Sequence, residues 1–319
     1  MDVFFYETFA EELRLLKDHL PDTVTAGFSS VTVQDDPISS PPAGLICIRT
    51  QSVIPTSWKH LLQGVLTRST GYDHIQSLHS DLNIRCGYLP HYCSRAVAEQ
   101  AMVLWTALFR KLPAQAKTFS VFNRDGLTGR ECMGRTLLVV GVGNIGYEVC
   151  RLGEALGMNV VGVDIVQRHS DVRYVSLEEG LAQADVIVCA MNLTDDNMEY
   201  FDHETLRKAR HGCVFINIAR GELSPLKALV RLMEEGHLGG VALDVFEHES
   251  ELSHHLRTGE GHEDGVIRSI RLLTQHDNVI LTPHNAFNTE EALMRKVKQT
   301  IEQIEAFHGT GEFLWPLPD

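Results

Sequence analysis

The feature that most constrains the fold is a set of short, wholly apolar runs that alternate with amphipathic helical stretches in the second half of the chain. Strands that are apolar on both faces are typical of parallel sheets covered by helices on both sides. The runs expected to be strands are Thr136–Val140, Asn159–Val163, Asp185–Ala190, Val214–Ile218, Gly240–Leu243 and Val279–Thr282. This pattern predicts a doubly wound domain over about residues 99–287.

A shorter alternation occupies the first third of the chain. Its expected strands are Val3–Tyr6, Leu45–Arg49 and Val65–Arg68, and its expected helices are Glu11–His19 and Ser94–Leu112, with Pro113 ending the second helix or lying just past its end. A final helix follows a capping box at Asn288–Glu291 and carries the apolar stripe Leu293, Val297, Ile301 and Ile304. Because this helix follows the doubly wound domain, we expect it to pack on the first third. The predicted domains are therefore 1–98 with 288–319, and 99–287.

Composition narrows the class of partner and the compartment. The formal net charge of −14 disfavours binding to nucleic acid and to anionic membrane surfaces. The chain has 7 cysteines with no close pair, which is typical of reduced thiols in the cytosol. The N-terminus lacks the pattern of a signal peptide, and no apolar run is long enough to span a membrane. These observations predict a cytoplasmic protein.

A glycine-rich segment, Gly141-Val-Gly143-Asn144-Ile145-Gly146, joins the first strand of the doubly wound domain to the helix Asn144–Leu156. Gly141 permits a tight turn, Gly143 lets the backbone approach a pyrophosphate, and Gly146 lets helix and strand pack closely. The helix N-terminus offers free N–H groups and a positive dipole end. A strand before the motif and a helix after it make a dinucleotide site much more specific than the glycines alone.

An acidic residue, Asp164, ends the next strand, where it would accept hydrogen bonds from the adenosine ribose. Its charge would repel a 2′-phosphate, so the sequence predicts NAD rather than NADP. Arg168 lies close enough in sequence to soften that preference.

Three later strands end in residues able to do chemistry: an arginine at Arg220, carboxylates from Asp244 to Glu249, and a histidine at His284. Open α/β sheets bind their ligands at the carboxyl ends of the strands. An Arg, a carboxylate and a His are therefore expected at one edge of the sheet.

From about Leu66 onward the chain resembles the D-isomer-specific 2-hydroxyacid dehydrogenases. Besides the glycine-rich segment, the matching motifs are Arg68-Ser-Thr-Gly-Tyr-Asp73, Ala96-Val-Ala-Glu-Gln-Ala101, Asn217-Ile-Ala-Arg-Gly221, Asp244-Val-Phe-Glu247 and Thr282-Pro-His284. The residues after His284, ending at Phe287, and the polar insert before Asp277 resemble the D-lactate branch. The resemblance implies a Rossmann-type NAD domain inserted in a flavodoxin-like substrate domain, and reversible NAD-dependent reduction of pyruvate or a similar 2-oxo acid.

The resemblance also implies the catalytic residues. Arg220 would bind the substrate carboxylate and polarise its carbonyl, since a guanidinium pairs with a carboxylate through two hydrogen bonds. His284 would be the acid in reduction and the base in oxidation. Glu249 would hydrogen-bond His284 and orient it, with Glu247 as the competing candidate. Glu249 is preferred because the lactate-like branch places its acid five residues after the counterpart of Asp244.

Binding residues are carried over in the same way. The cofactor set is Gly141, Gly143, Asn144, Ile145, Gly146, Asp164, Met191, Asn192, Asn197, Ile218, Ala219, Arg220 and Asp244, with Asp244 near the nicotinamide amide. The family often has a proline where this chain has Asn192, so the conformation there is left open. The substrate set is Thr70, Gly71, Tyr72, Tyr92, Arg220, His284 and Phe287. The resemblance also implies a homodimer, with the long helix near Ala98–Leu108 and the arm after it as the expected contact.

Other interpretations remain beside this one. The same fold and catalytic residues occur in NAD(H)-sensing corepressors, and other branches of the family act on glycerate or hydroxypyruvate. His248, His254, His255, His262 and His276 match no zinc-binding spacing, which favours a polar loop and no metal.

Overall fold

The computed structural model describes residues 1–259 and 265–318. The chain divides into two compact units, which we call unit 1 (residues 1–93 and 288–319) and unit 2 (residues 94–287). The predicted boundary at residue 98 would cut through helix α3, which begins at Ser94 and belongs to unit 2. Along the described ranges, no helix has the length and apolarity needed to cross a membrane.

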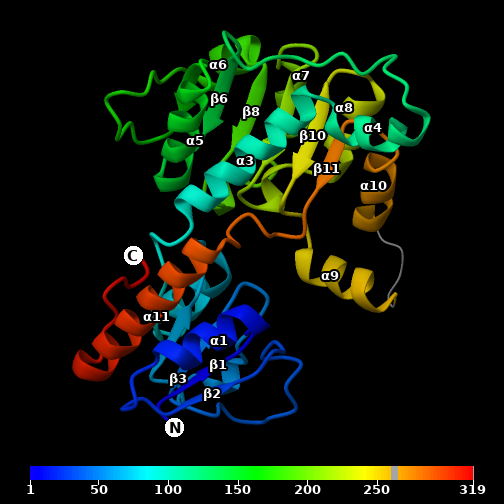
Figure 1. Cartoon of the computed structure of the whole chain (residues 1–319). Helices are drawn as coiled ribbons and strands as arrows, with labels where there is room; N and C mark the ends of the chain where they lie inside the picture. The colour runs from blue at the N-terminus through cyan, green and yellow to red at the C-terminus, as the bar shows by residue number, and fades with distance from the viewer. Residues whose placement is uncertain (260–264, 319) are drawn as a thin grey trace. The chain divides into compact units, whose positions relative to one another are not determined.

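Unit 1, which Figure 1 draws in blue and cyan with helix α11 in red, is built on a sheet of five parallel strands in the order β2-β1-β3-β4-β5. The strands are β1 Val3–Phe5, β2 Ala26–Phe28, β3 Leu45–Ile48, β4 Gly64–Thr67 and β5 Arg85–Gly87. The helices are α1 Ala10–His19, α2 Gln76–Ser80 and α11 Glu290–Thr310, with short 3-10 turns at Thr56–Trp58 and Asp73–Ile75. This strand order is that of flavodoxin-like sheets, and α11 packs beside α1.

Two strands of unit 1 are not apparent in the sequence pattern. β2 and β5 are three residues long, and each contains a glycine, so neither carries an apolar run. They form because neighbouring strands supply their hydrogen-bond partners: β2 pairs with β1, and β5 pairs with β4.

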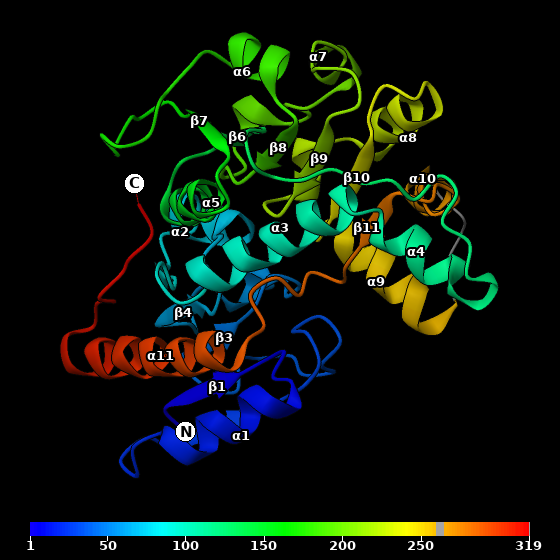
Figure 2. The same ribbon diagram turned by 45° about the horizontal axis from the view of Figure 1, so that its top comes forward.

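Unit 2 contains six parallel strands in the order β11-β10-β9-β8-β6-β7, which Figure 2 shows in reverse order from left to right. The strands are β6 Thr136–Val140, β7 Asn159–Val163, β8 Val186–Cys189, β9 Val214–Asn217, β10 Gly240–Leu243 and β11 Val279–Leu281. The strand order reverses between the neighbouring strands β6 and β8, because β7 lies on one side of β6 and the later strands lie on the other. The two doubly wound domains predicted from the sequence are therefore confirmed.

Helices cover the sheet of unit 2. They are α3 Ser94–Phe109, α4 Leu112–Thr118, α5 Asn144–Ala155, α6 Leu177–Gln183, α7 His203–Arg207, α8 Leu226–Glu234, α9 Glu249–Thr258 and α10 Gly265–Leu273. Short 3-10 turns lie at Phe119–Val121, Asp195–Asn197 and Gly221–Leu223. α3 packs along α5 and across β9 and β10, whereas α7 and α10 pack against α8.

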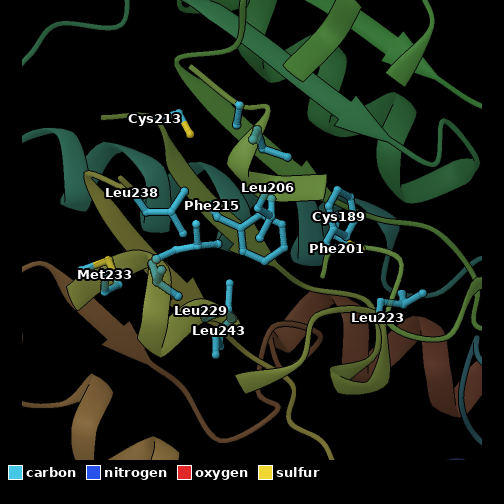
Figure 3. Packing of buried hydrophobic residues seen from close by; sticks show 14 of the residues in the cluster. Cys189, Phe201, Leu206, Cys213, Phe215, Leu223, Leu229, Met233, Leu238 and Leu243 are labelled. Carbon is cyan, nitrogen blue, oxygen red and sulfur yellow. The ribbon is translucent and has the colours of Figure 1, made fainter. Parts of the chain in front are cut away.

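The core of unit 2 joins the sheet to its helices. Phe215 on β9 and Phe201 before α7 are fully buried, with ring centroids 5.1 Å apart, and Leu206 of α7 lies beside them (Figure 3). Burying a large apolar side chain contributes roughly 1.5–3 kcal/mol. This packing places β9 against α7, and Arg220 follows three residues after the end of the strand.

Helix ends differ in detail from the expected ones. The helix from Ser94 stops at Phe109 rather than Leu112 because Lys111 adopts a left-handed conformation (φ 50°), and Pro113 then lies in the first turn of α4. The capping box expected at Asn288–Glu291 is also displaced. Thr289 is the N-cap of α11, and its hydroxyl accepts a hydrogen bond from the N–H of Ala292.

The histidine-rich insert expected to be a polar loop is largely helical. His254 and His255 lie on α9, whose first turn contains Glu249. His262 lies outside the described residues. The insert thus contributes a helix that begins at a candidate catalytic acid.

Candidate functional site

The glycine-rich turn between β6 and α5 depends on two glycines for its shape. Gly141 has φ +91°, and a Cβ there would lie 2.5 Å from the backbone of Met191. A Cβ on Gly146 would lie 1.9 Å from the carbonyl oxygen of Gly141. The tight turn and the close packing expected of these two glycines are therefore observed.

Gly143 is different, because the protein itself does not require a glycine there. Its φ of −80° suits any residue, and a Cβ would meet nothing within 4 Å. It is the N-cap of α5, a position without a side-chain cap at which N–H groups face outward. The open space in front of a bare helix N-terminus fits the pyrophosphate of a dinucleotide.

Asp164, at the end of β7, fastens this turn. Its carboxylate accepts hydrogen bonds from the N–H of Val142 (2.6 Å) and of Val166 (2.9 Å). The next residue, Ile165, is fully exposed. Sequence reasoning missed both features, although an apolar residue directly after the acid was a readable signal.

The segment after β8 is shaped by side-chain hydrogen bonds. Asn197 donates from Nδ2 to the carbonyl of Asn192 (2.8 Å), and its Oδ1 accepts from the N–H of Thr194 (2.8 Å). The backbone of Met191 lies against Gly141. Asn197 thus restrains the conformation at Asn192, where the resemblance leads one to expect a proline.

Arg220 leaves the sheet at the end of β9 through a turn organised by Asn217. The buried Asn217 amide donates to the carbonyl of Arg220 and to Ser224 Oγ (both 2.8 Å), and its Oδ1 accepts from the N–H of Ala219 (2.9 Å). Ile218 and Ala219 are the two residues that connect Asn217 to Arg220. Asn217 is a positioning residue that sequence reasoning named only as part of a motif.

Asp244, at the end of β10, organises the loop after β11. Its carboxylate accepts hydrogen bonds from Thr282 Oγ1 (2.5 Å) and from the N–H groups of Asn285 (3.0 Å) and Ala286 (2.9 Å). Burial raises the pKa of this carboxyl above its usual value, although these hydrogen bonds act in the opposite direction. The bonds surround His284, so Asp244 holds the histidine loop in place.

His284 is paired with Glu249. Its Nδ1 lies 2.7 Å from Glu249 Oε1, and both side chains are about three-quarters buried, with 27% and 23% exposed. His284 itself has φ 50°. The competing acid, Glu247, instead accepts from the N–H of Leu226 (2.7 Å), at the start of α8. The hydrogen bond to Nδ1 leaves Nε2 as the nitrogen available for proton transfer.

The strand register brings Arg220 and His284 to one edge of the sheet. Leu243 on β10 is in register with Asn217 on β9 and with Leu281 on β11, and Arg220, Asp244 and His284 follow these positions. Strands lie about 4.8 Å apart, so the backbones of Arg220 and His284 are separated by roughly two such spacings.

The remaining substrate candidates lie in unit 1, except Phe287, which is buried in unit 2. Thr70 donates from Oγ1 to the carbonyl of Leu89 (3.0 Å), the carbonyl of Gly71 accepts from Ser69 Oγ (2.7 Å), and Tyr72 packs edge-on against Tyr88. Tyr92 is 4% exposed. Among the described residues, no cluster of His, Cys, Asp and Glu is arranged to hold a metal ion.

The fold and the site define an enzyme class: a two-domain dehydrogenase that binds a dinucleotide. Residues 102–286 match the family model described as D-isomer specific 2-hydroxyacid dehydrogenase, NAD binding domain. The chain belongs to this family, it is an NAD-dependent dehydrogenase, and its cofactor is NAD.

Individual relatives agree with this assignment. The chain is 31% identical to 2-hydroxyacid dehydrogenase A of Aspergillus oryzae over 92% of this chain and 87% of the relative. It is also 31% identical to an aromatic 2-oxoacid reductase of Clostridium sporogenes, over 77% of this chain and 75% of the relative. The crystal structure of a D-lactate dehydrogenase from Aquifex aeolicus, complexed with NAD and lactic acid, superposes with a TM-score of 0.86 at 28% identity. That match covers 98% of this chain and 99% of the other.

Alanine substitutions at the two kinds of glycine should separate cofactor binding from folding. Gly143→Ala should weaken NADH binding at least about tenfold, or about 1.4 kcal/mol, because its methyl group would occupy the pyrophosphate space. Its Tm should change little, since the Cβ meets no protein atom. Gly146→Ala should instead lower Tm, with an overpacking cost of about 1–3 kcal/mol. NADH fluorescence titration and thermal unfolding measure the two effects, and unchanged NADH affinity in Gly143→Ala would contradict this placement of the cofactor.

Proposed function

We propose that the protein catalyses the reversible reduction of a small 2-oxo acid to the D-2-hydroxy acid, with His284 as the proton donor. The observation that carries the proposal is the His284–Glu249 hydrogen bond at the carboxyl edge of the sheet of unit 2, where His284 follows β11 and Arg220 follows β9, with only β10 between these two strands. An oriented imidazole and a guanidinium at this spacing suit a substrate that has a carboxylate next to a carbonyl.

Each side chain has a separate task. Arg220 binds the substrate carboxylate and stabilises the negative charge that develops on the carbonyl oxygen. His284 donates its Nε2 proton to that oxygen, while Glu249 holds Nδ1 and stabilises the protonated ring. NADH, when bound, supplies the hydride that forms the new C–H bond at the carbonyl carbon. In oxidation, Nε2 of the neutral ring takes the hydroxyl proton back.

We assign the cofactor and substrate residues on the same basis. Gly143, Asn144 and Ile145 would hold the pyrophosphate, Asp164 the ribose, and Ile165 would give the adenine an apolar surface. The segments at Met191–Asn192, Asn197 and Ile218–Ala219 would line the rest of the cofactor, and Asp244 would lie near the nicotinamide amide. In unit 1, the backbone of Thr70–Tyr72 and the side chain of Tyr92 would contact the substrate, as would Phe287 in unit 2.

The group attached to the carbonyl carbon of the substrate is best identified by measuring kcat/KM for a panel of 2-oxo acids. We expect kcat/KM with NADH to be measurable for pyruvate, 2-oxoisocaproate or phenylpyruvate, and to exceed the value with NADPH. The relatives named for lactate and for aromatic 2-oxo acids define this range. Glyoxylate and hydroxypyruvate test the other branches. Tight NADH binding without turnover of any acid would contradict the proposal and favour an NAD(H)-sensing role.

Two glutamates allow a matched test of the acid that orients His284. Glu249→Gln should lower kcat on the order of 100-fold, because an amide no longer favours the protonated ring. Glu247→Gln should leave kcat within about twofold and instead lower Tm slightly, since Glu247 caps α8. Steady-state kinetics and thermal unfolding distinguish them. Equal losses of kcat in both variants would contradict the assignment.

We also propose a homodimer formed through the arm after α3. This segment exposes several large apolar side chains, and a shallow pocket beside it is lined partly by Val103, Ala107 and Leu112. Phe119 and Phe122 are 76% and 74% exposed. Phe119→Ser with Phe122→Ser should therefore convert a dimer to a monomer in sedimentation analysis, whereas Val53→Ser, an exposed apolar change in unit 1, should not. A monomeric unmodified protein would contradict the proposal.

The seven free thiols suit a cytoplasmic location.

A further inference from the structure

Unit 1 contains a buried cluster of charges at the carboxyl ends of its strands, formed by Glu12, Arg68 and Lys296. Glu12 Oε1 lies 3.0 Å from Arg68 Nε and 2.7 Å from Lys296 Nζ. All three residues are at most 1% exposed. They come from three separate segments, α1, the end of β4, and α11. Removing three charges from water costs desolvation free energy, which their mutual attraction and hydrogen bonds must offset.

Arg68 connects the cluster to the candidate substrate loop. Its guanidinium donates to the carbonyls of Tyr6 (2.8 Å) and Cys47 (2.9 Å), at the ends of β1 and β3. β1 and β3 flank the point where this sheet reverses its strand order, which is where such sheets bind ligands. The segment Thr70–Tyr72 begins two residues after Arg68.

α11 connects the cluster to Tyr92. Arg295 Nε donates to the carbonyl of Tyr92 (2.8 Å), and the next residue, Lys296, places its Nζ 5.9 Å from the centroid of the Tyr92 ring. The same Nζ lies 5.7 Å from the centroid of the Phe9 ring. Two consecutive cations of one helix therefore hold the backbone and the ring of a candidate substrate residue.

Opposing effects determine the pKa of Lys296. Burial lowers its pKa to about 7, Glu12 opposes this shift, and the positive charges of Arg49 and Arg68 reinforce it. Burial also opposes ionisation of Glu12, but Arg68 and Lys296 outweigh that effect and keep the Glu12 pKa well below its usual range. The other titratable groups facing this cluster, Cys47, Tyr92 and Cys93, have pKa values raised by burial and are neutral. Lys296 is therefore the member whose charge changes around neutral pH.

We propose that Lys296 is a positioning residue for the anionic substrate, acting through Tyr92 and through the positive charge it adds at the carboxyl edge of unit 1. In a chain with a net charge of −14, an acid gains no long-range attraction, so local cations must supply it. With Lys296 protonated, Arg49, Arg68 and Lys296 outnumber Glu7 and Glu12. This inference rests on the proposed function, since it assumes that the ligand is a 2-oxo acid held in part by Tyr92.

A purely structural role makes a different prediction, so the two can be separated. The measurement is the Kd of oxamate, a 2-oxo acid analogue, for the NADH-bound protein between pH 6 and pH 8.5. It is made on the unmodified protein, Lys296→Met, Lys296→Arg, and Lys298→Met, an exposed lysine of the same helix. Dividing each variant's Kd by that of the unmodified protein at the same pH cancels every effect of pH that the four proteins share. Tm and NADH affinity check that each variant is folded.

We expect the Kd ratio of Lys296→Met to be on the order of tenfold at pH 6, the size expected for one unit charge acting over roughly 12 Å at an effective dielectric constant of about 20, and to fall towards one at pH 8.5. Lys296→Arg keeps its charge, so its ratio should be about one at pH 6 and below one at pH 8.5. The Kd ratio of Lys298→Met should stay near one at every pH.

Kd ratios that do not depend on pH, even with a changed Tm, would show a structural role only and overturn the inference. No oxamate binding by the unmodified protein would overturn the proposed function as well. If Lys296→Met does not fold, the pH dependence of the Kd ratio of Lys296→Arg tests the inference instead.

Discussion

Replacing His284 by Asn is expected to lower kcat for oxo-acid reduction about 1,000-fold, within the range that general acid–base catalysis contributes. Asn is chosen because His284 has φ 50°, a conformation that Asn tolerates better than most residues. The loop should therefore keep its hydrogen bonds to Asp244, and the loss should come from the missing proton donor. Stopped-flow kinetics in the reduction direction give kcat, and fluorescence titration gives the Kd for NADH, which should stay within about twofold because the pyrophosphate is held at α5.

The matched control is His248→Asn. His248 has the same φ of 50° and stands next to Glu249, but its side chain is exposed and it is not part of the proposed site. Its kcat should be close to that of the unmodified protein. Comparable losses in the two variants would mean that distortion near α9, and not loss of the imidazole at residue 284, limits the rate. Activity retained by His284→Asn would show that another group donates the proton.

Arg220→Lys is expected to reduce kcat/KM for the oxo acid on the order of 100-fold or more, although the positive charge is kept. An ammonium cannot pair with a carboxylate through two parallel hydrogen bonds, and its shorter reach moves the charge away from the carbonyl oxygen. Part of the loss should appear in KM and part in kcat, because Arg220 is proposed both to bind the carboxylate and to stabilise the developing charge.

Arg231→Lys serves as the control for this change. Arg231 lies on α8, is 63% exposed and pairs with Glu235 within the same helix, so its replacement should alter neither kinetic constant. Unchanged kcat/KM in Arg220→Lys would exclude two-point recognition of a carboxylate and would leave a non-specific electrostatic role.

Several elements could be predicted from the sequence because their signals are local. Thr136–Val140, Asn159–Val163 and Gly240–Leu243 were predicted with the bounds that the structure shows, because each is a short, mainly apolar run between turn or helix signals. β2 and β5 were missed because a three-residue strand stabilised by its neighbours needs no apolar pattern of its own.

The site was predicted in outline but not in its internal contacts. Placing Arg220 and His284 at strand ends required only the order of strands and glycines. The hydrogen bonds that position them were not readable, because Asn217, Asp244 and Asn197 act on backbone groups whose conformation the pattern does not reveal. The resemblance alone favoured Glu249 over Glu247, and the structure adds the contact between His284 and Glu249, the first residue of α9.

By itself, the sequence determined the alternation that builds two doubly wound units, the glycine-rich turn with Asp164, and the residue types that end β9, β10 and β11. These follow from periodicity and turn chemistry, which act over a few residues. Only the tertiary structure decided that His284 pairs with Glu249, that Asp244 holds the histidine loop, and that Lys296 lies buried against Glu12. The partners in each pair are far apart in sequence. Strand register and helix packing bring them together, and whether a charged side chain is buried depends on which surfaces meet.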